Sequence, residues 1–116
     1  MKYCYTESDR KGTCYHEFQK GKFNGSFWKE DSLLIHEDSL LIHDDNLYIL
    51  HLADIFHSVV PSYSEYGETE IIKEQWNEIY NRASEIDGEI KIAIDEINCW
   101  AKIVFKTEDI FTILGI

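Results

Sequence analysis

Residues 88–116 read GEIKIAIDEINCWAKIVFKTEDIFTILGI, and two patterns within them decide the fold class. Over residues 88–105 the apolar side chains recur every third or fourth position, as on one face of a helix. This face comprises Ile90, Ala93, Ile94, Ile97, Trp100, Ala101 and Val104. After Glu108-Asp109 comes an apolar tail, residues 110–116, which we expect to be buried as a last strand on a sheet or packed under the helices.

Two more helices are predicted upstream of this segment. The first begins with Asp45 or Asn46 as N-cap and ends at Pro61, which removes a backbone donor. Its apolar face is Ile49, Leu52, Ala53, Phe56 and Val60. Residues 61–68 are expected to form a loop, and Thr69 then caps a second helix that ends near Ala83. Its apolar face is Ile72, Trp76, Ile79, Tyr80 and Ala83.

The first 43 residues favour an antiparallel β region. Residues 30–36 and 37–43 are an identical tandem repeat, EDSLLIH, and residues 44–51 are a degenerate third copy. We expect strands at residues 33–36 and 40–43 joined by a turn at 37–39, because Asp and Ser side chains bond nearby backbone groups. Asn24-Gly25 predicts a further hairpin, since both residues accept positive φ.

The expected architecture is therefore a single α+β domain over residues 1–116. Residues 1–43 would be mainly β, and residues 46–116 mainly helical with a short C-terminal strand. A chain of 116 residues is long enough for one core but not for two. Apolar residues make up 44% of it, which argues against disorder despite the high charge.

Charge is the strongest compositional signal. The chain holds 11 Lys and Arg against 22 Asp and Glu, a formal net charge of −11. The negative charge is concentrated after residue 29, and residues 1–29 are net basic. Such a surface repels nucleic acid and anionic membranes and attracts a basic protein. The alternative is that the charge only confers solubility.

We expect a cytoplasmic protein without a membrane segment or a disulfide framework. Its longest apolar runs are far shorter than the roughly 18 residues of a membrane helix, and the N-terminus has no signal-peptide pattern. The three cysteines, Cys4, Cys14 and Cys99, are an odd number and form no CxxC motif. Free thiols are therefore predicted, with Cys99 filling space within its helix.

Neither catalysis nor a bound metal or other cofactor is expected. His36 and His43 are copies within the repeat, and His51 and His57 are six residues apart, unlike the i, i+4 pair that binds zinc. His16-Glu17 lacks the second histidine of HExxH. Serine-nucleophile, P-loop and dinucleotide-binding motifs do not occur in the sequence.

Two acidic clusters are the candidate partner-binding residues. The first lies in the predicted turns of the repeat region: Glu30, Asp31, Glu37, Asp38, Asp44 and Asp45. The second is a stripe at i, i+4 and i+8 on the second predicted helix: Glu70, Glu74 and Glu78. Each cluster is either an ordinary solvated surface or a docking surface for a basic partner, and Lys73 and Arg82 dilute the second.

The chain resembles the immunity proteins of bacterial polymorphic-toxin and contact-dependent growth-inhibition systems. The likeness covers residues 30–116 and rests on the acidic segment 30–46, on YGETEI and QWNEI at residues 66–71 and 75–79, on DEI at 95–97 before Trp100, and on FTILGI at 111–116. It implies a cytosolic protein that binds and neutralises a cognate toxin domain, often a nuclease. Nucleases are commonly basic, so an acidic inhibitor can occupy their substrate surface.

Two other functional classes fit the same charge. An acidic nucleic-acid mimic, or a phage-type inhibitor, would block a host protein that binds nucleic acid. An accessory subunit of an enzyme would have no inhibitory role. A toxin gene immediately upstream would favour the immunity function.

Overall fold

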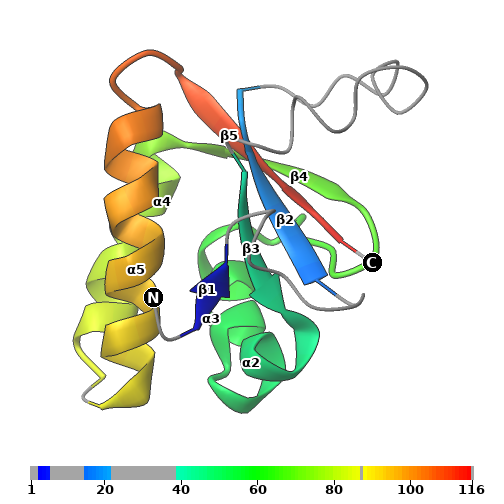
Figure 1. Ribbon diagram of the computed structural model, residues 1–116, viewed down its shortest axis with the longest axis vertical. Coiled ribbons are helices and arrows are strands. Elements are labelled where there is room, and N and C mark those ends of the chain that lie inside the picture. The colour runs from blue at the N-terminus through cyan, green and yellow to red at the C-terminus, as the bar shows by residue number, and fades with distance from the viewer. Residues whose placement is uncertain (1–2, 6–14, 22–38, 87, 116) are drawn as a thin grey trace.

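The computed structural model describes residues 3–5, 15–21, 39–86 and 88–115 (Figure 1). The first copy of the repeat, the turn at residues 37–38, the Asn24-Gly25 hairpin and Cys14 lie outside these residues. The predictions made for them stay predictions.

Five antiparallel strands in the described residues form one sheet. They are β1 (Cys4–Tyr5), β2 (Tyr15–Lys20), β3 (Leu40–His43), β4 (Glu68–Ile72) and β5 (Ile110–Leu114), in the order β1-β3-β2-β5-β4. The C-terminal tail thus forms a strand between β2 and β4, with Phe18 opposite Ile113 and Ile71 opposite Phe111. The expected α+β class is confirmed, and so is the last strand.

Helices pack against one face of this sheet (Figure 1). They are α2 (Asp44–Ile49), α3 (Leu52–Val59), α4 (Lys73–Ser84) and α5 (Glu89–Val104). The longer two, α4 and α5, lie side by side. The predicted helix at residues 88–105 is confirmed as α5, whose buried residues all belong to the predicted apolar face: Ala93, Ile94, Ile97, Ala101 and Val104.

Aromatic rings fill the core between the helices and the sheet. Phe111 of β5 stacks on Phe18 of β2 with ring centroids 5.9 Å apart. Trp76 of α4 and Trp100 of α5 meet the Phe111 ring edge-on at 5.6 and 5.3 Å. Because the Phe111 ring contacts Phe18 of β2 and a tryptophan from each long helix, β5 lies at the centre of the core.

The prediction of one continuous helix ending at Pro61 is wrong. The chain forms α2 and α3, with His51 between them in the left-handed region at φ 57°. Leu50 and Leu52 are both buried, but a continuous helix would place them about 200° apart. The break lets both side chains enter the core and leaves Ile49 72% exposed. The N-cap of α2 is His43, whose ring accepts from the Asp45 amide at 3.1 Å, rather than Asp45 or Asn46.

The predicted helix from Thr69 is wrong in its first turn. Glu68–Ile72 is strand β4, which buries Thr69 and Ile71 and exposes the residues between them. Pairing with β5 outweighs the helical spacing here, because β-branched Thr and Ile fit a half-buried strand. The helix starts at Lys73, where Gln75 Oε1 accepts from the Ile72 amide at 3.0 Å.

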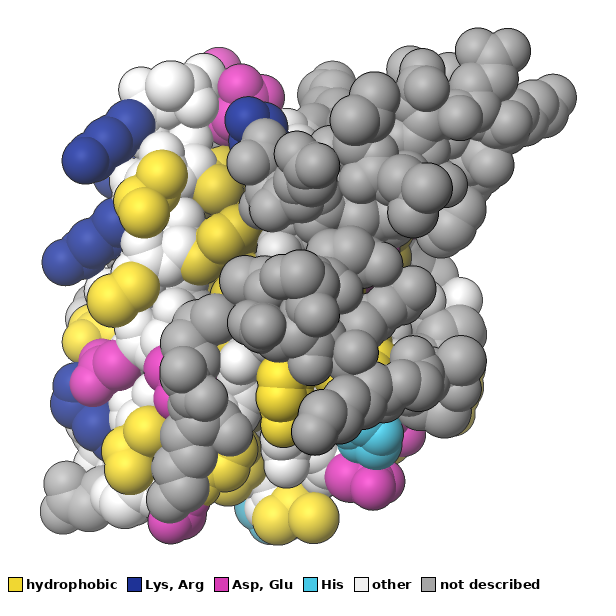
Figure 2. Space-filling model, viewed as in Figure 1, with side chains coloured by type: hydrophobic (Ala, Val, Ile, Leu, Met, Phe, Trp, Pro, Cys, Tyr) yellow, Lys and Arg dark blue, Asp and Glu magenta, His cyan; other side chains and the backbone are white. Residues whose placement is uncertain are grey.

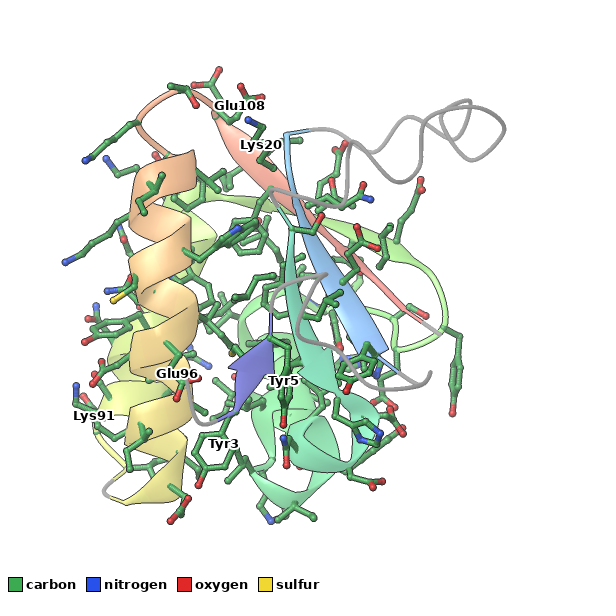
Figure 3. All side chains as sticks on the ribbon, viewed as in Figure 1. Tyr3, Tyr5, Lys20, Lys91, Glu96 and Glu108 are labelled. Atoms are coloured by element: carbon green, nitrogen blue, oxygen red, sulfur yellow. The ribbon has the colours of Figure 1, made fainter. Side chains whose placement is uncertain are left out.

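A carboxylate joins the N-terminal strand to α5. Glu96 Oε1 accepts hydrogen bonds from the backbone amides of Tyr3 and Cys4 at 3.0 and 2.9 Å (Figure 3). Burial raises the pKa of the Cys4 thiol, which therefore stays protonated at neutral pH. Cys99, expected to fill space, is instead exposed on α5, because it lies outside the apolar face of that helix.

Candidate functional site

Opposite charges occupy different elements of the fold. Ten Asp and Glu and no Lys or Arg lie between Glu30 and Ile72 in the sequence. The described part of this segment forms β3, α2, α3 and β4. The Lys and Arg residues that follow lie on or just after α4 and α5, and Figure 2 shows such side chains along the edge of α5. A basic partner would therefore meet no like charge from the described residues of segment 30–72.

Helix α2 and the loop at residues 61–67 together present tyrosines beside carboxylates. The Tyr48 phenol donates a hydrogen bond to Glu65 Oε2, and Tyr66 is the next residue along the loop. Tyr66 is 79% exposed and Tyr48 46% exposed. We define the acidic tyrosine surface as Asp44, Asp45, Tyr48, Ile49, Glu65 and Tyr66.

The loop that carries Glu65 and Tyr66 is fixed by backbone contacts. The Gly115 amide donates to Gly67 O at 2.7 Å, and the Ser64 amide donates to Thr69 Oγ1 at 3.2 Å. A Cβ at Gly115 would lie 2.3 Å from Glu65 O, so only glycine lets the end of β5 approach this closely. The surface is therefore held in place by the sheet, which lowers the entropy lost on binding.

Asp44 also has a structural role. His16, on β2, is fully buried, and its Nε2 lies 2.6 Å from Asp44 Oδ1. This contact fixes the start of α2 to the sheet. Asp45 is 78% exposed, and its carboxylate lies 3.7 Å from His43 Nδ1. Asp45 is thus the α2 carboxylate whose substitution leaves the buried contact in place.

The carboxylates of this region act on the neighbouring phenols. The Glu65 carboxylate that accepts from Tyr48 raises the pKa of that phenol. Burial, with smaller effects of Glu65 and Asp44, raises the pKa of Tyr63, whose hydroxyl has no hydrogen-bond partner in the described ranges. Both phenols therefore stay neutral at physiological pH and do not add negative charge to this region.

The structure brings together only some of the predicted acids. Asp44 and Asp45 form the first turn of α2. The stripe of Glu70, Glu74 and Glu78 is wrong as a helical stripe, because Glu70 lies on β4 and only Glu74 and Glu78 are on α4. Glu78 is also paired with Arg82 at 2.9 Å. The other predicted residues, Glu30, Asp31, Glu37 and Asp38, lie outside the described residues.

The sequence alone does not identify four members of this surface: Tyr48, Ile49, Glu65 and Tyr66. The usable signal was the stretch of 43 residues without Lys or Arg, which extends well beyond the repeat. Ile49 was instead assigned to a buried helical face. The contact between α2 and the loop joins residues 17 positions apart, which no periodicity reveals.

Two acids in the segment that resembles immunity proteins have internal partners. Asp95 accepts from the Tyr80 phenol at 2.7 Å and from Lys91 Nζ at 2.9 Å. The Lys91 ammonium lowers the pKa of Asp95, with Tyr80 contributing in the same direction. Glu96 holds β1, as described above. Both carboxylates are therefore bonded within the fold, although Asp95 is 45% exposed.

The described residues contain no group of three or more His, Cys, Asp or Glu placed to hold a metal ion. None of the helices in the described ranges has the length and apolar character needed to cross a membrane. Comparison with protein-family models, with curated proteins and with solved structures finds no match to this chain. The resemblance to immunity proteins therefore stays a prediction.

Proposed function

We propose that this chain is an immunity protein, which binds and neutralises a cognate bacterial toxin domain by occupying its basic surface. The observation that carries the proposal is the acidic tyrosine surface, where exposed tyrosines and carboxylates lie in a segment without Lys or Arg. A nuclease is the toxin class that best fits, because its substrate groove must attract phosphates.

The side chains on this surface can contribute both to the rate of association with a toxin and to the binding energy. Asp45 and the other exposed carboxylates speed association with a basic partner and disfavour acidic ones. Tyr48, Tyr66 and Ile49 supply apolar area, and tyrosine is enriched among the residues that dominate binding energy at interfaces. The fixed loop adds preorganisation. The proposed activity is binding alone, in the cytoplasm, without catalysis or a cofactor.

The proposal predicts a toxin gene immediately upstream of this gene, and the test is protection against, and binding of, the toxin domain that it encodes. The parent and two surface variants, Asp45→Lys and Tyr66→Ala, are each co-expressed with that domain. The matched control is Asp109→Lys, which makes the same charge change in the turn between α5 and β5, at the opposite end of the molecule from α2 (Figure 1).

We expect the parent and Asp109→Lys to protect, and both surface variants to bind more weakly. Truncating a desolvated acid at an interface costs about 2–5 kcal/mol of binding, whereas a rim acid alters mainly the association rate and its salt dependence. Equal binding by all four proteins would contradict the proposed surface. Capture of a host nucleic-acid-binding protein, with no binding of the neighbouring gene product, would favour the nucleic-acid mimic instead.

A further inference from the structure

A second feature lies away from the acidic tyrosine surface, between the start of α4 and the end of α5. There a pocket of about 290 Å³ is lined by three lysines, two asparagines and two aromatic residues: Lys73, Trp76, Asn77, Asn98, Lys102, Phe105 and Lys106. None of these seven residues is acidic, although the chain has twice as many acids as bases.

The three lysines are free to bind a ligand. Within the described ranges, Lys73, Lys102 and Lys106 form no ion pair within 4.0 Å, whereas Arg82 and Lys91 on the same helices do. The charge of Lys102 contributes to lowering the pKa of Asp95 without a direct contact, since the ammonium bonded to Asp95 is that of Lys91. Lys73 also lines a neighbouring pocket with Glu74, Glu108 and Asp109, whereas Lys102 and Lys106 line only the first of the two. The like charges of the lysines repel each other, and a bound anion would relieve that repulsion.

Helix stability explains only part of this cluster. Lys102 lies in the last turn of α5 and Lys106 just beyond it, where cations interact favourably with the helix dipole. Lys73 is the first residue of α4, where a cation opposes the dipole. Its position is therefore unfavourable for the isolated helix but completes the basic rim of the pocket.

The polar and apolar groups of the pocket are arranged around this rim. The Trp76 indole N–H donates to Asn98 Oδ1 at 2.9 Å, which leaves the Asn98 amide hydrogens available as donors. Trp76 and Phe105 supply apolar wall. Ammonium and amide donors in the same pocket as aromatic side chains suit a phosphate group attached to a compact ring.

We propose that this pocket binds a small phosphate ester that carries one ring. Its volume of about 290 Å³ is just below the roughly 300–1,000 Å³ found for ligand pockets, so the ligand is small. An acidic macromolecule would also be repelled by the net charge of −11. A small ligand responds mainly to charges within a Debye length, about 8 Å at physiological ionic strength. The site is independent of toxin binding.

The experiment is a titration of the full chain with phenyl phosphate, inorganic phosphate and phenol. The readout is the NMR signal of the Trp76 indole N–H, which lies in the pocket wall. The test variant is Lys102→Gln with Lys106→Gln, and Lys106→Gln alone serves if the double variant loses its fold. The matched control is Lys91→Gln, which removes one ammonium from the same helix outside the pocket.

We expect phenyl phosphate to bind most tightly, inorganic phosphate more weakly, and phenol not to shift the Trp76 signal. Removal of each pocket lysine should weaken phenyl phosphate binding about tenfold, the effect of one charge-assisted hydrogen bond. Lys91→Gln should leave the affinity within about twofold of the parent. Equal shifts with phenol and phenyl phosphate, unchanged affinity in the lysine variants, or no binding of any phosphate would overturn the proposal.

Discussion

Residues 40–72 and residues 73–115 contribute to the same sheet and core, yet they differ in how their side chains are used. The first segment consists of short elements, lacks Lys and Arg, and contains the two most exposed large apolar side chains of the described residues, Tyr66 at 79% and Ile49 at 72%. The second contains both long helices and the inner strand β5, and its acids Asp95 and Glu96 are bonded internally.

This difference predicts a separation of roles. Substitutions at the exposed positions of residues 40–72 should change binding with little effect on the free energy of unfolding. Substitutions at the buried positions of residues 73–115 should lower stability first. The acids of the two segments are similar in sequence, so only their partners in the fold distinguish them.

Removal of residues 110–116 should have the largest effect. It deletes β5, which pairs with both β2 and β4. Phe111, Ile113 and Leu114 each contribute roughly 1.5–3 kcal/mol through burial, against a typical total stability of about 5–15 kcal/mol. We expect an unfolded chain by circular dichroism. A truncated protein that keeps the parent's melting temperature would show that the second segment does not carry the stability.

Phe111→Ala tests the same strand with a single change. The ring packs against Phe18, Trp76 and Trp100, so truncation leaves a cavity at the centre of the core. We expect a loss of about 3–5 kcal/mol in the free energy of unfolding, measured by urea denaturation. A loss below about 1 kcal/mol would place the core elsewhere.

Gly115→Ala tests the junction of the two segments. The added Cβ would collide with Glu65 O, so the backbone of either β5 or the 61–67 loop must move. We expect a stability loss of about 1–3 kcal/mol, as for other overpacked sites. NMR shifts should extend to Glu65 and Tyr66. Shifts confined to β5 would mean that the loop is not held by the sheet.

Asp95→Asn should give a smaller, pH-dependent effect. The lowered pKa means that the folded state favours the carboxylate, so Asp95 adds stability above its unfolded pKa and loses it as the pH falls through the folded value. The variant should melt below the parent at neutral pH, and the gap should narrow as the pH falls below about 3.9, the usual pKa of Asp. Because the pair is largely exposed, the difference should be small. A gap that persists in acid would indicate packing rather than charge.

The sequence predicted the second segment better than the first, for physical reasons. In α5, the apolar residues that recur along 16 residues are the ones that are buried. In β5, the tail is so apolar that burial is expected on both faces of the strand, and residues 111–114 are all buried. The elements α2, α3 and β4 are too short for the spacing of apolar residues to distinguish helix from strand. Packing against the sheet and core therefore determines the conformation of Leu50 and Thr69.

The sequence predicts the acidic charge of the candidate site but not which other residues belong to it. The acids Asp44 and Asp45 follow from the sequence, because a solvated turn and a helix start both favour them. Tyr48 and Tyr66 join the site only through the contact of α2 with the 61–67 loop. Lys73, Lys102 and Lys106 are brought together only by the packing of α4 on α5.

The central claim is that the most exposed side chains of the acidic tyrosine surface, Asp45 and Tyr66, bind a basic partner and contribute little to stability. The most direct measurement pairs the dissociation constant for the neighbouring toxin domain with the melting temperature, for Asp45→Lys, Tyr66→Ala and the control Asp109→Lys. We predict that Tyr66→Ala and Asp109→Lys keep a free energy of unfolding within about 0.5 kcal/mol of the parent. Asp45→Lys should lose about 1 kcal/mol, because a lysine in the first turn of α2 opposes the helix dipole. Only Asp45→Lys and Tyr66→Ala should bind more weakly. Unchanged binding by both surface variants at physiological salt would contradict the claim.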